Sequence, residues 1–135
     1  MTLELVSLTG IKFSGEAYEV TIPTASGEIA VYPDHMPLVT IAVPGVLTVK
    51  KTKSSAADVY ATLGGVVEID GTIIRLLADE VERAEDIIEA DVQKALDAAQ
   101  KLKASAKNQV DIDKAQAMMD RQAIRLKVAG LRKRR

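Results

Sequence analysis

The chain has 135 residues, of which 47% are hydrophobic and 27% are charged, a balance typical of a folded protein and not of a disordered one. It contains no cysteine, which excludes disulfides, thiolate nucleophiles and cysteine-based metal sites. No run approaches the ~20 apolar residues of a membrane-spanning helix, and the first residues lack the features of a secretion signal. We therefore expect a soluble protein that meets a membrane only through partners.

The net charge of −1 hides a difference between the two parts of the chain. Residues 1–84 carry 6 Lys and Arg against 11 Asp and Glu, whereas residues 85–135 carry 12 against 8. The last fifteen residues contain no acid and seven cations: Arg121, Arg125, Lys127, Arg132, Lys133, Arg134 and Arg135. A chain polarised in this way indicates that its basic end meets an acidic surface.

The first part of the chain predicts β-structure. All four prolines and seven of the eight glycines lie before residue 72, and both residue types interrupt helices. Apolar, β-branched segments bounded by turn residues predict strands at 16–22, 27–33, 36–43, 45–51, 65–69 and 72–78. Asp70-Gly71 between the last two predicts a hairpin with a type I′ turn, which needs positive φ at both residues. Short, closely spaced strands predict an antiparallel sandwich or barrel.

The second part predicts two helices, at about 90–105 and 111–130. Apolar residues recur at helical spacing from Val92 to Leu102 and again from Ile112 to Ala129, with Ala123 or Gln122 in the second stripe. Asp111 is the predicted N-cap of the second helix. Both stripes are rich in alanine, which buries little apolar area, so the hairpin should be marginal alone. We expect it to dock on its own sandwich, on a ligand or on a partner.

Three segments, in this order, resemble the epsilon subunits of F-type ATP synthases. Residues 26–39 resemble the family's Gly-Glu opening, apolar strand and Pro-x-His-x-Pro-Leu loop. Residues 64–69 resemble its Gly-Gly-aromatic-x-Glu strand, with Val66 where an aromatic residue is usual. Residues 78–87 resemble the acidic junction between its two domains. The resemblance covers nearly the whole chain.

The resemblance implies a β-plus-α fold: an antiparallel sandwich of about ten short strands at 1–84, then an antiparallel two-helix hairpin at 85–135. In the family, the sandwich stands at the foot of the central stalk, against the gamma subunit and the c-ring. The hairpin lies folded or extends along gamma towards the alpha and beta subunits, and it then restrains ATP hydrolysis. The implied role is a non-catalytic rotor subunit in proton-driven ATP synthesis, peripheral to the cytoplasmic face of the bacterial inner membrane.

The resemblance also implies a contact with the c-ring and gamma, through Glu28, Pro33, His35, Pro37 and Leu38. His35 is the only histidine, and a lone histidine without a second ligand or a triad partner indicates a structural or interface role. The two prolines of the loop also stiffen a turn, and this role is compatible with the contact. The neighbouring acidic residues lack the glycine-punctuated spacing of a calcium loop, so we expect a solvated linker there and no metal site.

The sequence does not decide whether the hairpin binds a nucleotide. The chain has no P-loop, but many bacterial members of the family it resembles bind ATP on the folded hairpin, through Ile/Leu-Asp-x-x-Arg-Ala at the start of the first helix. Residues 90–95 keep Asp91 but carry Lys94 at the arginine position, and lysine lacks the planar fork that grips phosphate. Arg121 and Arg125 match the family's paired arginines, and Glu82 matches an acidic contributor. Weak regulatory binding of ATP and no cofactor at all are both compatible with this pattern.

The basic residues of the second helix have three possible roles: contact with the beta subunit, which we favour, binding of nucleic acid, or a solvated chain end. By the resemblance, Arg121, Arg125 and Lys127 meet an acidic loop of the beta subunit. Nucleic acid is disfavoured because aromatic residues do not interleave the cations, and Arg132–Arg135 are expected to be a solvated end. As a whole, the alternative to a rotor subunit is a free-standing sandwich adaptor with a helical partner-binding or nucleotide-sensing arm.

Overall fold

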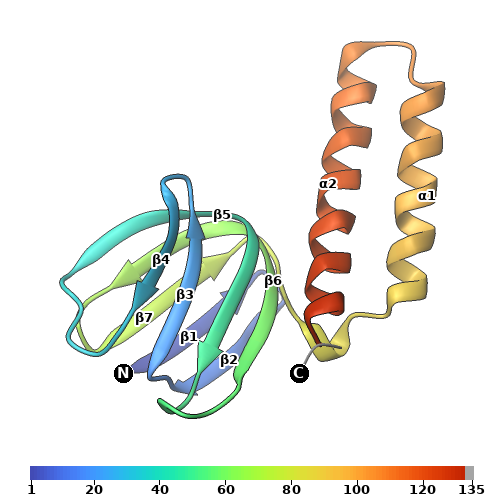
Figure 1. Cartoon of the computed structure of the whole chain (residues 1–135). Coiled ribbons are helices and arrows are strands. Elements are labelled where there is room, and N and C mark those ends of the chain that lie inside the picture. Colours follow the sequence, from blue (N-terminus) through green and yellow to red (C-terminus); the bar gives the residue numbers. More distant parts are fainter. Residues whose placement is uncertain (133–135) are drawn as a thin grey trace. The chain divides into compact units, whose positions relative to one another are not determined.

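The computed structural model describes residues 1–132, and its contacts divide the chain into two compact units between Arg83 and Ala84 (Figure 1). Lys133, Arg134 and Arg135 of the basic end lie outside the described residues. Among the helices described, none is long and apolar enough to cross a membrane. The β-plus-α fold class predicted from the sequence is confirmed.

The first unit is one sheet that folds over on itself to enclose a core (Figure 1). Its strands are β1 (Thr2–Ser7), β2 (Gly10–Glu16), β3 (Glu19–Thr24), β4 (Gly27–Val31), β5 (Leu38–Lys50), β6 (Ala57–Ile69), β7 (Ile73–Ala78) and β8 (Val81–Arg83). The spatial order is β2-β1-β7-β6-β5-β3-β4, and β8 pairs with β6. β5 and β6 have 13 residues each and pair along their whole lengths, so they join the two layers.

The strand count and one pairing differ from expectation. The described sheet has eight strands where about ten were expected, and β1 pairs with β7 in parallel, not antiparallel. The predicted strands 36–43 and 45–51 are one strand, because Pro44 keeps its register opposite Leu63 while the neighbouring Gly64 adopts a φ of 103°. β1 and β2 were missed, although Leu3 and Leu5 alternate with polar residues as a half-buried strand requires.

The core is built of aliphatic side chains from both layers. The largest fully buried ones include Leu3, Leu5, Ile22, Leu47 and Leu76. Two aromatic rings border them, those of Phe13 and Tyr60, whose centroids lie 6.4 Å apart in an edge-to-face arrangement. The whole cluster lies within residues 1–83, so the first unit has a core of its own.

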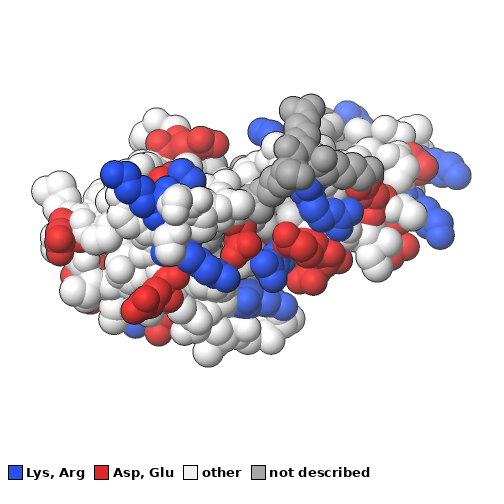
Figure 2. Space-filling view, turned by 60° about the horizontal axis from the view of Figure 1, so that its bottom comes forward, with Lys and Arg blue, Asp and Glu red and all other residues white. Residues whose placement is uncertain are grey.

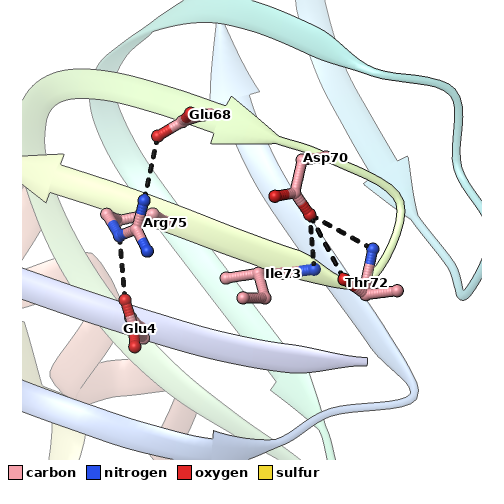
Figure 3. A network of polar contacts seen from close by, with 6 residues as sticks. All are labelled: Glu4, Glu68, Asp70, Thr72, Ile73 and Arg75. Carbon is pink, nitrogen blue, oxygen red and sulfur yellow. Dashed lines mark hydrogen bonds and ion pairs between the residues drawn. The ribbon is translucent and has the colours of Figure 1, made fainter.

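The hairpin predicted at Asp70-Gly71 joins β6 to β7, but its turn is not type I′. Gly71 has a φ of 86°, whereas Asp70 is not among the residues with positive φ. The Asp70 side chain organises the turn instead, because its Oδ1 accepts from the backbone N–H of Ile73 at 3.1 Å and of Thr72 at 3.4 Å (Figure 3). Asp-Gly therefore indicated the hairpin correctly and the turn type wrongly.

The second unit contains a short 3₁₀ turn, η1 (Ala84–Asp86), and two helices, α1 (Glu89–Ser105) and α2 (Gln109–Arg132). The helices are antiparallel, since Lys103 near the end of α1 donates to Gln116 near the start of α2 at 2.6 Å. At the other end of the hairpin, Arg132 forms an ion pair with Glu89 at 3.6 Å. In the second stripe Gln122 is the buried residue and Ala123 is exposed.

The N-cap of the second helix is Asn108, not Asp111. The Asn108 Oδ1 accepts from the backbone N–H of Asp111 at 2.9 Å, and its Nδ2 donates to the Asp111 carboxylate at 3.0 Å. Asp111 consequently lies inside the first turn of α2, where its charge still favours the positive helix end. Asn and Asp are nearly equal as N-caps, so residue type did not decide between the two positions.

Candidate interaction surfaces

A row of apolar side chains crosses five strands on the outer face of the sheet. Strand register places the residues opposite one another, and paired residues point to the same face. Ile41 is 66% exposed and Ile11 is 70% exposed; Val66 and Leu77 are 46% and 51% exposed, and Val6 is half-buried. This apolar row comprises Ile41 (β5), Val66 (β6), Leu77 (β7), Val6 (β1) and Ile11 (β2).

The sequence analysis missed the apolar row as a site. The sequence does contain a sign of it: residues 65–69 and 72–78 are nearly continuous apolar runs, in which polar and apolar residues do not strictly alternate. A continuous run indicates a strand that is covered on both faces, whereas the core covers only one face here. The sheet therefore presents an apolar surface of the kind that marks an interaction site.

A second row, two residues further along the strands, lies beside the apolar row on the same face. We call it the charged row: Val39 (β5), Glu68 (β6), Arg75 (β7), Glu4 (β1) and Ser14 (β2). Arg75 lies between the two carboxylates, with its Nε 2.9 Å from Glu4 and its Nη1 3.1 Å from Glu68 (Figure 3). The hydrogen bond and the charge of Glu4 are the main reasons why the pKa of Arg75 is raised.

The predicted contact residues lie in the edge strand β4 and in the connection that leads from it to the first residue of β5. Pro33 and Asp34 form a turn in which the His35 N–H donates to the Tyr32 carbonyl at 3.2 Å, and Asp34 has a φ of 65°. The His35 Nδ1 is 2.7 Å from the Met36 carbonyl oxygen, which holds the ring against its own loop. Pro37 and Leu38 are both exposed. The loop is therefore stiff and presents apolar groups.

Glu28 does not lie with this loop. It is exposed at the start of β4, opposite Pro23, whereas the Pro33–Leu38 loop follows the end of the strand. The length of β4 separates them by about 15 Å at a rise of about 3.3 Å per residue. The structure therefore places Glu28 at the start of the edge strand β4 and the other four predicted contact residues in the connection from β4 to β5, not in one cluster.

On the second helix, three cations occupy the half of α2 nearest its C-terminus. Arg121 and Lys127 are exposed, and Arg125 is half-buried with its Nη1 donating to Gln122 Oε1 at 2.9 Å. Arg121 and Arg125 are one helical turn apart, so they lie on one side of α2. This hydrogen bond gives the buried Gln122 amide oxygen a partner and helps to orient the Arg125 guanidinium.

Two of the candidate nucleotide residues, Asp91 and Lys94, are exposed on the first two turns of α1. The Glu89–Arg132 and Lys103–Gln116 contacts set the register, which brings these turns beside the last turns of α2, where Arg125 lies. Lys94 and Arg125 are thus at a similar height on the hairpin. Glu82 belongs to the first unit, in β8.

Charges of both signs are interspersed over the face of the molecule shown in Figure 2, and neither sign forms a continuous patch there. Such a surface differs from the basic stripe of a nucleic-acid-binding domain. Within residues 1–132, no three His, Cys, Asp or Glu side chains are grouped so that they could hold a metal ion.

Comparison with known proteins identifies the class to which this fold and these surfaces belong. Residues 1–84 match the family model of the ATP synthase delta/epsilon chain, β-sandwich domain. The chain is 37% identical to the ATP synthase epsilon chain of Chromobacterium violaceum, and the match covers 100% of this chain and 96% of that one. It is 34% identical to the epsilon chain of Polaromonas naphthalenivorans, over 98% and 94% of the two chains. The chain belongs to the family of ATP synthase epsilon subunits.

Solved structures agree with this assignment. A chain in the Euglena gracilis mitochondrial ATP synthase, from an OSCP/F1/c-ring structure, superposes with a TM-score of 0.76 at 25% identity, over 94% of this chain and 79% of that one. A chain in the central stalk/c-ring structure of the Tetrahymena thermophila enzyme has a TM-score of 0.62 at 12% identity, over 96% of each chain. The second likeness shows the fold alone.

Proposed function

We propose that this chain is a non-catalytic rotor subunit that joins the gamma subunit to the c-ring during proton-driven ATP synthesis. The observation that carries the proposal is the apolar row, which crosses five strands and is exposed on four of them, in a chain whose relatives are ATP synthase epsilon chains. Exposed apolar surface of this kind is stabilised when a partner covers it, so we assign the row to the gamma contact. The subunit then lies at the cytoplasmic face of the bacterial inner membrane, held there by its partners.

We assign the second contact, with the c-ring, to β4 and the loop that joins it to β5. The stiff turn at Pro33–Leu38 supports this assignment, because a loop fixed by two prolines loses little conformational freedom on binding. Glu28 stands about one strand length away and contacts a separate part of the ring. A rotor subunit needs such a second contact, distinct from the gamma face, to transmit torque.

The test of the gamma contact is a binding measurement with F1 complex prepared without this subunit. Ile41→Asp and Leu77→Asp place charges in the apolar row and should each weaken binding at least tenfold, because a desolvated carboxylate would face apolar groups. Val110→Asp alters a 62%-exposed apolar residue of α2 and is the matched control. Wild-type protein that fails to bind F1 would favour the free-standing adaptor.

We propose further that the second helix restrains hydrolysis, through Arg121, Arg125 and Lys127. Their position on the C-terminal half of α2 supports this role, since an acidic surface of the beta subunit would meet several cations from one helix. Replacing all three with Glu should raise the ATPase rate of the assembled complex several-fold without releasing the subunit. An unchanged ATPase rate would contradict this part of the proposal.

ATP as a weak regulatory ligand of the hairpin stays a prediction. Lys94, Arg121 and Arg125 supply three cations for phosphate, but lysine offers one point charge in place of a bidentate fork. We expect a dissociation constant in the high micromolar to millimolar range, roughly one to two orders weaker than with arginine at this position. Calorimetry of the wild type beside Lys94→Arg measures the difference directly.

A further inference from the structure

The charged row has more acid than base, and this imbalance lies directly beside the apolar row. Arg75 is the only cation of the row, and both Glu4 and Glu68 bind it, so the row as a whole carries one net negative charge. The remaining two members, Ser14 and Val39, are uncharged. Of the three charged side chains, that of Glu68 is the most exposed, at 52% against 38% for Arg75 and 34% for Glu4.

A partner that covers the apolar row also covers Glu68. The two rows are two residues apart on β1, β5, β6 and β7, which corresponds to about 7 Å, and three residues apart on β2, where the register with β1 shifts. Val66 and Glu68 are therefore neighbours on one face of β6, and a partner surface that contacts the first reaches the second. Removing water from a carboxylate that shares Arg75 with a second carboxylate is costly unless the partner supplies a donor of its own.

We infer that the partner surface carries a Lys or Arg that binds Glu68, placed about 7 Å from the apolar group that contacts Val66. This inference rests on the proposed function, because it assumes that a stalk subunit covers the face. Glu68 and Arg75 then act as specificity determinants: Arg75 orients the carboxylate, and the partner's cation completes its charge balance. A partner with an apolar stripe but no flanking cation would leave one buried negative charge without compensation.

The experiment compares Glu68→Gln with Glu19→Gln in binding to F1 prepared without this subunit, at low and at high salt. Glu19 also binds a cation, Lys50 at 3.0 Å, but it lies on β3, outside the five strands that carry the rows. Both variants lose one charge and one ion pair, and Glu19 is the more buried of the two, at 18% exposed against 52%, so a loss of stability alone should affect the control at least as much. Glu68→Gln should weaken binding about tenfold at low salt and reduce the salt dependence, whereas Glu19→Gln should stay within about twofold.

The salt dependence of binding by an Arg75→Gln variant separates a role in recognition from a merely structural ion pair, which would leave that dependence unchanged. The variant leaves two carboxylates on the row, so attraction to a cation of the partner should increase and the salt dependence of binding should become steeper. Loss of affinity that is equal at all salt concentrations would overturn the inference. So would a Glu68→Gln variant that binds as tightly as the wild type while Ile41→Asp does not bind. Failure of the wild type itself to bind would overturn the proposed function, and this inference with it.

Discussion

At the scale of single residues, Gly65 and Gly10 have the same backbone peculiarity in different surroundings. Both have positive φ, 145° and 115°, which a side chain rarely adopts. A Cβ at Gly65 would collide with the Leu77 carbonyl oxygen and lie 2.7 Å from the Ala78 Cα, whereas one at Gly10 would meet nothing within 4 Å. The close approach of β6 to β7 at this point therefore requires glycine, and it supports the strand that carries the apolar row.

Gly65→Ala should lower the free energy of unfolding by about 3 kcal/mol or more, because backbone strain and a clash with the backbone of β7 act together. Gly10→Ala should cost only about 1–2 kcal/mol, from strain alone. Urea denaturation of both variants measures the difference. Equal destabilisation of the two would show that β7 yields to the added methyl group.

Asp34 is the only residue other than glycine with positive φ in the described chain, at 65°. It follows Pro33 in a turn closed by the Tyr32 carbonyl, which is the arrangement that favours Gly or Asn at this position. Asp34→Ala should lower the free energy of unfolding by about 1 kcal/mol, while Asp34→Gly should be close to neutral. Thermal denaturation distinguishes the two variants. An alanine variant as stable as the wild type would show that the positive φ at position 34 does not strain the turn.

At the scale of elements, the helical hairpin depends on local polar contacts, because its seam is poor in large apolar residues. The buried residues of α1 are Val92 and Ala99, and those of α2 include Ala115 and Gln122. Such a seam contributes little hydrophobic stabilisation. Caps and contacts at the ends of the helices therefore have a larger share in its stability than they would have in a leucine-rich hairpin.

Asn108→Ala should lower the stability of the start of α2 by about 1 kcal/mol, because the N–H of Asp111 loses its acceptor. Asn108→Ser keeps an acceptor for the Asp111 N–H without placing a second carboxylate beside that of Asp111, and it is the matched control. Hydrogen exchange of the first-turn amides of α2 is the measurement. Faster exchange in Asp111→Ala than in Asn108→Ala would restore the sequence-based assignment of the cap.

At the scale of the whole molecule, the apolar core of the sandwich lies entirely within residues 1–83. A fragment of residues 1–84 should therefore fold cooperatively and keep its affinity for F1, because the apolar row is intact. The reconstituted complex should hydrolyse ATP faster than with the full chain, since α2 is missing. Restraint of hydrolysis by the fragment alone would assign inhibition to the sandwich.

Features of the fold that depend on local interactions were predicted from the sequence, whereas features that depend on long-range pairing were not. Gly and Pro positions, the change of hydrophobic period at about Asp91 and the Asp70-Gly71 pair are local signals, and they predicted strands, helices and a hairpin. The parallel pairing of β1 with β7 joins residues about seventy positions apart, and no local pattern contains it. The continuity of β5 through Pro44 likewise depends on what β6 places opposite.

The sequence by itself determined the fold class, the family resemblance and the candidate residues of the loop and of the basic helix, because these depend on residue types and short spacings. Only the tertiary structure decided which residues share a face. Val6, Ile11, Ile41, Val66 and Leu77 come from five strands, and strand register alone aligns them. The same register brings Arg75 between Glu4 and Glu68, so the surface that we assign to the stalk results from pairing and not from any single segment.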